Sequence, residues 1–178
     1  MNVEELAAHP PAVQAVWSEQ VEALLEDWHH RVYAAQSAHY ASADHFRRLN
    51  YGIGVPAIVL SSVVGTTVFA GLAKESPSSW IVASISILSA VLAGLQTFLR
   101  FAERETLHAT AADWYSAIRR DIEQVLHLSV AERGKPKDCL DEVRKEMNRA
   151  AQDAPALTGR RWRREAERFR VEEPMPRR

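Results

Sequence analysis

The sequence lacks most of the features that mark a secreted protein or a known class of enzyme. Its single cysteine, Cys139, cannot form an internal disulfide, so nothing indicates an oxidising compartment. The opening stretch MNVEELAAHPP is acidic where a signal peptide is basic, and we expect no cleavable signal. The glycine-rich phosphate-binding motifs and the GxSxG nucleophile motif are absent. No nucleophile has a base placed beside it, so we expect no catalytic residues and no enzyme.

Charge is absent from two long segments. No residue from Leu49 to Ala73 or from Ser76 to Leu99 is charged. As a helix, the second segment would be roughly 36 Å long, which exceeds the roughly 30 Å hydrocarbon core of a bilayer. We therefore expect transmembrane helices over residues 49–73 and 79–100, joined by an extracytoplasmic turn at 74–78. A buried helical pair in a soluble core is the alternative, but the remaining apolar sequence is too short to surround two such helices.

The basic residues beside these segments predict their orientation. Four arginines lie on the outer flanks of the pair, whereas the turn offers one lysine beside one glutamate. The four are Arg47, Arg48, Arg100 and Arg104. Because flanking lysine and arginine residues favour the cytoplasmic side, we expect both termini to be cytoplasmic.

Apolar residues recur at helical spacing on both sides of the uncharged segments. They form one stripe within residues 1–48 and a second within residues 101–128. The expected interface residues are Trp17, Leu24, Trp28, Leu107, Trp114, Ile118 and Ile122. Because no proline interrupts residues 12–55 and no breaker follows Phe101, each arm is expected to continue its transmembrane helix. The two arms would then bury their stripes against each other as an antiparallel pair.

The C-terminal part begins after a break at LSVAERGKPKD, which contains Gly134 and Pro136. A short amphipathic helix is expected over residues 137–153, followed by a basic tail over residues 154–178. The expected membrane-surface residues of the tail are Arg160, Arg161, Trp162, Arg163, Arg164 and Phe169. A solvated tail with partial helix is an equal alternative, and contact with RNA ranks behind both. The predicted fold is thus an all-α membrane protein, a two-span transmembrane helical hairpin with long cytoplasmic helical extensions and a short C-terminal helix.

Small and hydroxylated residues collect on one side of each predicted span. Small side chains let helix backbones approach closely in a bilayer, where no hydrophobic force drives association. The predicted pore or helix-packing face comprises Ser61, Ser62, Gly65, Thr66, Ala83, Ser86, Ala90, Ala93, Gln96 and Thr97. Two helices cannot use all of this surface on each other, so we expect a homo-oligomer, and any pore must be built from several copies. Simple pairing, with the serines bonded to their own backbone, is the alternative.

Seven histidines invite a metal or catalytic interpretation. Paired arms would bring His39 roughly level with His108, close to the cytoplasmic surface. No HExxH, CxxC or similar ligand spacing organises the histidines, however, and polar side chains on a solvated stalk are common. We expect no metal and no cofactor.

Two stretches resemble a known family. HYASADHFRRLNYGIGVPAIVLSSVVGTTVF and LAGLQTFLRFAERETLHATAADWYSAIRRDIEQVL together cover roughly residues 39–126. They resemble the SLATT family, two-span bacterial effectors associated with SMODS-type nucleotidyltransferases and SLOG domains. The pattern includes Arg48 and Asn50 before the first span, the entry at residues 54–56 and the exit at residues 95–98.

The resemblance implies an effector of the bacterial inner membrane in an antiphage or conflict system. Such an effector would oligomerise into a pore that depolarises or lyses the cell when a nucleotidyltransferase, a SLOG-type protein or another sensor, or a nucleotide signal, triggers it. The competing hypothesis is a passive membrane-anchored scaffold that tethers a cytoplasmic partner through the stripes of its arms. We expect no specific nucleic-acid partner.

Overall fold

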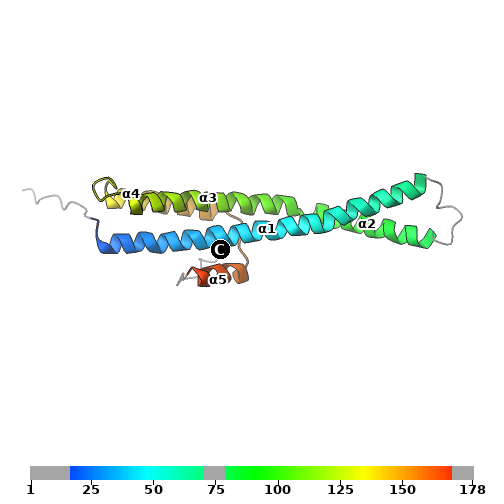
Figure 1. The fold of residues 1–178 in the computed structure, drawn as a ribbon, viewed down its shortest axis with the longest axis horizontal. Helices are drawn as coiled ribbons and strands as arrows, with labels where there is room; N and C mark the ends of the chain where they lie inside the picture. The colour runs from blue at the N-terminus through cyan, green and yellow to red at the C-terminus, as the bar shows by residue number, and fades with distance from the viewer. Residues whose placement is uncertain (1–16, 70–78, 170–178) are drawn as a thin grey trace, which may run out of the picture.

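The computed structural model describes residues 17–69 and 79–169. Within these ranges the chain forms five α-helices and no β-strand (Figure 1). The helices are α1 (Glu19–Phe69), α2 (Ser79–Leu99), α3 (Phe101–His127), α4 (Pro136–Asp153) and α5 (Gly159–Arg168). The start expected near residue 12, the turn at 74–78 and the end of the basic tail lie outside the described residues.

Helix α1 is one continuous helix that joins the N-terminal arm to the first uncharged segment. Ser18 precedes it, and the Ser18 Oγ accepts a hydrogen bond from the Val21 backbone N–H at 3.4 Å. Pro56 lies inside the helix and removes the hydrogen bond that the Gly52 carbonyl would accept. Helices in membranes tolerate such a loss, because neighbouring groups compensate for it. The N-terminal arm and the first span are therefore a single element.

The second arm does not continue its span without a break. Arg100 separates α2 from α3 and has left-handed backbone angles, with φ 49° and ψ 46°. This conformation costs an L-residue roughly 1–2 kcal/mol. The Arg100 guanidinium forms an ion pair with Glu103 at 2.5 Å, in the first turn of α3. The expectation of an uninterrupted helix through this point was wrong, because the sequence contains no glycine or proline that would have indicated the break.

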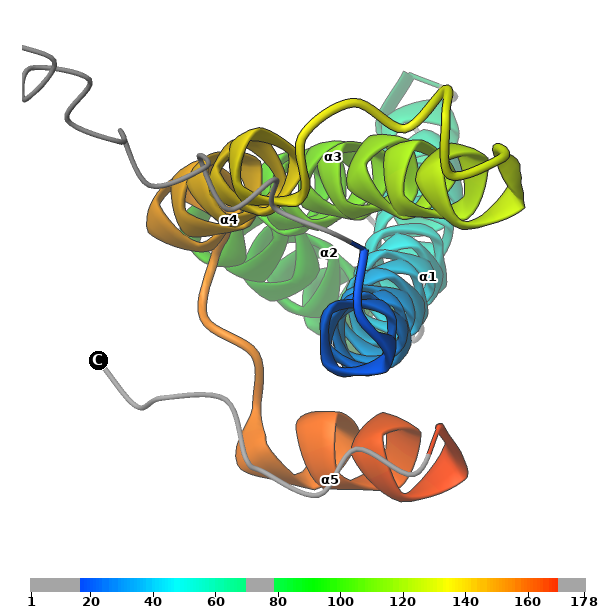
Figure 2. The ribbon, with the colours of Figure 1, turned by 90° about the vertical axis from the view of Figure 1, so that its left-hand side faces the viewer.

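The helices pack side by side along one axis. Helices α2 and α3 run back along α1, so that α2 lies beside its second half and α3 beside its first half (Figure 1). Helix α4 packs on α3, and α5 packs on α1 (Figure 2). We call residues 19–48 of α1 together with α3, α4 and α5 the stalk, and we call residues 49–69 of α1 together with α2 the spanning segments.

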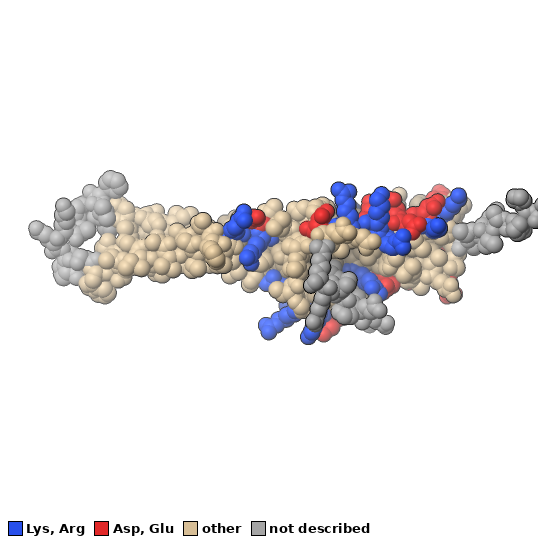
Figure 3. Space-filling model, turned by 180° about the vertical axis from the view of Figure 1, so that it is seen from behind, with Lys and Arg blue, Asp and Glu red and all other residues tan. Residues whose placement is uncertain are grey.

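The main cluster of buried hydrophobic residues lies in the stalk. Its residues come from four helices and include Leu25, Val32, Tyr115, Ile118, Ile122, Val143, Ala150, Trp162 and Ala166. The spanning segments instead expose large apolar side chains: Ile58 is 67% exposed, Trp80 68% and Phe98 82%. On the face seen in Figure 3, the charged residues lie over the stalk, and the described part of the spanning segments shows none. The chain thus contains two helices that are long and apolar enough to cross a membrane, and their apolar surface faces outward.

Candidate functional site

Two groups of polar contacts join the spanning segments. The hydroxyl groups of Ser61 and Ser89 are 2.5 Å apart, and the Ser89 Oγ also donates to the Ala57 carbonyl at 3.2 Å. Ala57 and Ser89 are both buried. Small residues at these positions bring the two backbones close enough for a side chain of α2 to bond the main chain of α1. This contact joins the uncharged segments of α1 and α2 through polar groups.

The second group lies nearer the stalk and is formed by an amide pair. The Gln96 Nε2 donates to the Asn50 Oδ1 at 3.2 Å. The same Gln96 amide covers Gly54, where an added Cβ atom would lie 2.6 Å from Nε2. Only a residue without a Cβ leaves Gln96 free to adopt this position.

The face of α2 that packs on α1 differs from the face expected from the sequence. Packing uses Ser89 and Gln96 together with the partly buried Ile85 and Leu92, whose spacing of three and four residues forms one stripe. The predicted small-residue face lies about 100° further around the helix. Its members Ala83, Ala90, Ala93 and Thr97 are exposed, and Ser86 is half-buried. The expected face is therefore left available, and it does not bind α1.

The hydroxyl groups outside the contact with α1 bond to their own helices. Ser86 donates to the Val82 carbonyl at 2.8 Å, and Thr97 donates to the Ala93 carbonyl at 3.1 Å. On α1, Ser62 donates to the Ile58 carbonyl at 2.9 Å, and Thr66 donates to the Ser62 carbonyl. Ser62 and Thr66 are exposed, and Gly65 is half-buried. Their polarity is thus satisfied locally, as the simple-pairing alternative expected, while the small surface itself is uncovered.

Sequence reasoning missed four of the residues that join the two spanning segments. Asn50, Gly54, Ala57 and Ser89 take part in the contact, whereas only Ser61 and Gln96 had been predicted. A signal was present, because Asn50, Gly54, Ala57 and Ser61 recur at spacings of three and four residues along α1. This spacing was overlooked because α2 carries more small residues on another face, and those residues were predicted to form the packing surface.

The arms meet as expected, but not with every expected residue. Ile118 and Ile122 are buried in the core, and Trp28 packs against it. Trp17 also packs there, and its Nε1 donates to the Gly134 carbonyl at 3.0 Å.

Three other predicted interface residues have less than half of their surface exposed but lie outside the core. Trp114 is 40% exposed, Leu107 48% and Leu24 38%. Trp114 lines a groove between α3 and α4 with Ala117 and Ala150, and does not face α1. The apolar stripe of α3 is wider than one partner helix covers. Leu107 and Trp114 lie on this helix and are therefore only partly covered.

A buried histidine pair joins α1 to α3 in the half of the stalk that is nearer the spanning segments. The Nδ1 atoms of His39 and His108 are 3.0 Å apart, so one ring donates a hydrogen bond to the other. The His39 ring stacks on Tyr115 and the His108 ring on Phe46. Burial, followed by the charge of His108, lowers the pKa of His39 from 6.5 to about 4. Burial, followed by the charge of Arg161, lowers the pKa of His108. Both rings are therefore neutral near pH 7.

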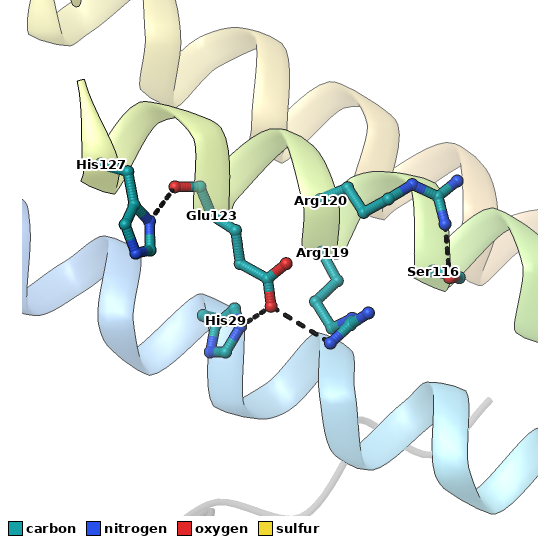
Figure 4. A network of polar contacts seen from close by, with 6 residues as sticks. All are labelled: His29, Ser116, Arg119, Arg120, Glu123 and His127. Atoms are coloured by element: carbon teal, nitrogen blue, oxygen red, sulfur yellow. Dashed lines mark hydrogen bonds and ion pairs between the residues drawn. The ribbon is translucent and has the colours of Figure 1, made fainter.

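A second polar network links α1 and α3 further from the spanning segments (Figure 4). The Glu123 carboxylate accepts hydrogen bonds from the His29 Nε2 at 3.0 Å and the Arg119 Nη1 at 3.1 Å. The hydrogen bond from His29 is the main cause of a lowered Glu123 pKa. On the same helix Arg120 donates to the Ser116 Oγ at 2.9 Å. Glu123 of α3 and His29 of α1 thus form a polar contact between the two arms.

The described residues contain no group of three or more histidine, cysteine or carboxylate side chains that could hold a metal ion. The histidine pair supplies two nitrogen atoms, and they are turned towards each other. This arrangement suits a packing contact between two helices.

The basic tail contains a helix, α5, that packs on the stalk. Trp162 is only 7% exposed, and the Phe169 ring lies 4.3 Å from the Tyr33 ring of α1. Both aromatic residues that were expected at the membrane surface lie on α1 here, and their membrane contact stays a prediction. Among the predicted arginines, Arg160, Arg163 and Arg164 are exposed and Arg161 is half-buried.

In comparisons with models of protein families, with curated proteins and with solved structures, nothing matches this chain. The resemblance to the SLATT family therefore stays a prediction that stands on the residues quoted for it.

Proposed function

We propose that this chain is an oligomeric membrane effector whose copies assemble into a pore across the bacterial inner membrane, with both termini in the cytoplasm. One observation carries the proposal. After α2 has packed on α1, the face formed by Ala83, Ala90, Ala93 and Thr97 is still exposed. A neighbouring copy can approach this face closely, since no side chain on it is larger than threonine.

The chemistry of the spanning segments favours a passive pore over a pump or coupled transporter. No Asp, Glu, Lys, Arg or His lies in either segment, whereas proton relays and ion-coupled transporters use such residues inside the membrane. Two helices are too few to enclose a channel, so several copies are required. A closed symmetric ring is the simplest assembly that repeats one contact.

The stalk would couple a cytoplasmic signal to the pore. Helix α1 is continuous from the stalk into the first spanning segment, whereas the left-handed Arg100 separates α3 of the stalk from α2. A change in the stalk would therefore move α1 and α2 differently. A sensor protein such as a nucleotidyltransferase or a SLOG-type protein, or a nucleotide signal, is the trigger that the family resemblance suggests.

A membrane-anchored scaffold is the second candidate function. The groove that Trp114 lines with Ala117 and Ala150 favours it, because an apolar surface groove can receive a side chain of a partner protein. Such a protein would tether a cytoplasmic partner without permeabilising the membrane.

Dye release from proteoliposomes separates the two functions. Pore formation predicts release of a small dye together with crosslinked species larger than a dimer, in the presence of the sensor or of its nucleotide product. A scaffold predicts binding of the partner with the dye retained under every trigger.

Orientation is checked separately in cells with cysteines that replace Ser78 and the exposed Gln124. Only the cysteine at position 78 should react with an impermeant reagent added from outside.

A further inference from the structure

Helix α5 has two unlike faces, and only one of them contacts the rest of the protein. Trp162 and Ala166, which are 7% and 8% exposed, lie against α1, and Phe169 continues the same face. The other face carries the exposed arginines Arg160, Arg163, Arg164 and Arg168. Within the described ranges only Arg168 is paired with a carboxylate, that of Glu165 at 3.8 Å. Three arginines thus project from this helix without a partner in the described part of the chain.

The contact of α5 with α1 leaves a buried polar atom of α5 without a hydrogen bond. The Trp162 Nε1 is buried and has no hydrogen-bond partner among the described residues, and the Glu165 Oε2 has only the ion pair with Arg168 at 3.8 Å. Water or a headgroup would satisfy the Trp162 Nε1 if α5 left the stalk. The docked position is therefore weaker than the burial of two aromatic residues would suggest.

The membrane surface is within reach of α5. Residues 154–158 join α5 to the end of α4, where Asp153 lines the same groove as Trp114 of α3. The rise along α3 from Arg100 to Trp114 is roughly 21 Å. When extended, residues 154–158 span at most roughly 17 Å. The headgroup layer extends roughly 5 Å beyond the hydrocarbon core, so the start of α5 can reach it while α1 to α4 keep their positions.

We propose that α5 exchanges between two surfaces, the stalk and the anionic inner leaflet, and that its aromatic face is buried on either one. On the membrane, Trp162 and Phe169 would enter the interface while Arg160, Arg163 and Arg164 pair with lipid phosphates. This inference rests on the membrane insertion in the proposed function and is independent of whether the protein forms a pore. An anionic lipid surface is the partner that fits, because it takes up both the apolar and the basic face of one short helix.

The distance between two spin labels tests the exchange in the full-length protein. The labels occupy cysteines that replace the exposed Glu167 of α5 and Gln124 of α3, in a chain in which Cys139→Ser removes the native thiol. In zwitterionic phosphatidylcholine vesicles we expect one short distance, that of docked α5. In vesicles rich in phosphatidylglycerol we expect a second, longer distance. Vesicle flotation confirms insertion in both lipids, so a failure of insertion is distinguished from a failure of α5 to move.

Charge variants identify the arginines as the cause. The combined change Arg160→Gln, Arg163→Gln and Arg164→Gln should lower the population of the long distance in anionic vesicles by about 100-fold relative to the docked state. Lysine at the same three positions should preserve it. The matched control removes three exposed cations from α4 by Arg144→Gln, Lys145→Gln and Arg149→Gln, and it should behave like the parent.

Three results would overturn the proposal. The first is the same distance in both lipids for the parent protein. The second is an equal effect of the α4 control, which would make the response one to net charge alone. The third is release of α5 by added RNA in phosphatidylcholine vesicles without any response to phosphatidylglycerol, which would assign the arginines to nucleic acid.

Discussion

The Nδ1 atoms of His39 and His108 lie 3.0 Å apart across the contact between α1 and α3. His39 is 1% exposed, and aromatic rings cover both imidazoles, so no water can separate them when they become charged. Two imidazolium groups at this distance would repel each other in a medium of low polarity. The pair is therefore stable only while at least one ring is neutral.

Acid is expected to destabilise the stalk through this pair. Because burial lowers the pKa of His39 to about 4, the unfolded chain binds more protons than the folded chain below the ordinary value of 6.5. The contribution is fully present above pH 6.5 and is lost as the pH falls to about 4, and it amounts to about 3 kcal/mol. Thermal unfolding, followed by circular dichroism at several values between about pH 4 and pH 7, measures this loss of stability.

Removing the histidines should flatten this pH dependence. The double change His39→Gln and His108→Gln keeps one hydrogen bond across the contact and has no titrating group. His45→Gln is the control, because His45 is exposed. An unchanged acid transition in the double variant would mean that other groups cause it.

Gly54→Ala should weaken the contact between the spanning segments, whereas Gly52→Ala should not. The added Cβ atom at position 54 would lie 2.6 Å from the Gln96 Nε2, so Gln96 must turn away and release Asn50. The loss is about 1 kcal/mol, which is the usual contribution of one hydrogen bond. At position 52 nothing lies within 4 Å, and alanine should raise helix stability slightly. Unfolding in detergent compares the two, and equal stabilities would show that Gln96 does not pack on α1 as described.

Ile122→Ala should destabilise the stalk far more than Trp114→Ala, although tryptophan is the larger residue. Ile122 is fully buried, and its truncation leaves a cavity that costs roughly 2 to 5 kcal/mol. Trp114 lies on the groove beside α4 and is 40% exposed, so its removal should cost less than about 2 kcal/mol. Chemical denaturation measures both. A larger loss for Trp114→Ala would place that residue inside the stalk interface.

Ala90→Leu should prevent assembly while Leu88→Ala is tolerated. The first change adds bulk to the exposed small-residue face, where a neighbouring backbone would approach, and costs roughly 1 to 3 kcal/mol at each contact of a ring. The second removes a half-exposed side chain from another face. Crosslinking and dye release at matched membrane levels compare them. If neither change alters assembly, the exposed face of α2 does not join the copies, and the pore loses its main support.

The sequence by itself determined the long apolar helices and the helical arms, but neither the break at Arg100 nor helix α5. The two uncharged segments predicted where long apolar helices occur, because the cost of placing charge in hydrocarbon depends on local composition. The period of apolar residues predicted helical arms that pair, since a 3.6-residue repeat places them on one face. The observed α3 (Phe101–His127) and α4 (Pro136–Asp153) begin and end within a residue or two of the predicted bounds.

Tertiary structure alone decided which faces are used. Periodicity shows that α2 has a small-residue face, but Gln96 over Gly54 and Ser89 against Ala57 select another face for α1, because close fit depends on the partner's shape. The left-handed Arg100 is likewise set by how α2 and α3 lie on α1, since no residue in the sequence requires it. The basic tail carries the composition of a membrane-surface segment, yet its aromatic face is buried on the stalk. Composition describes what a face can bind, whereas the three-dimensional arrangement determines which surface lies nearest to it.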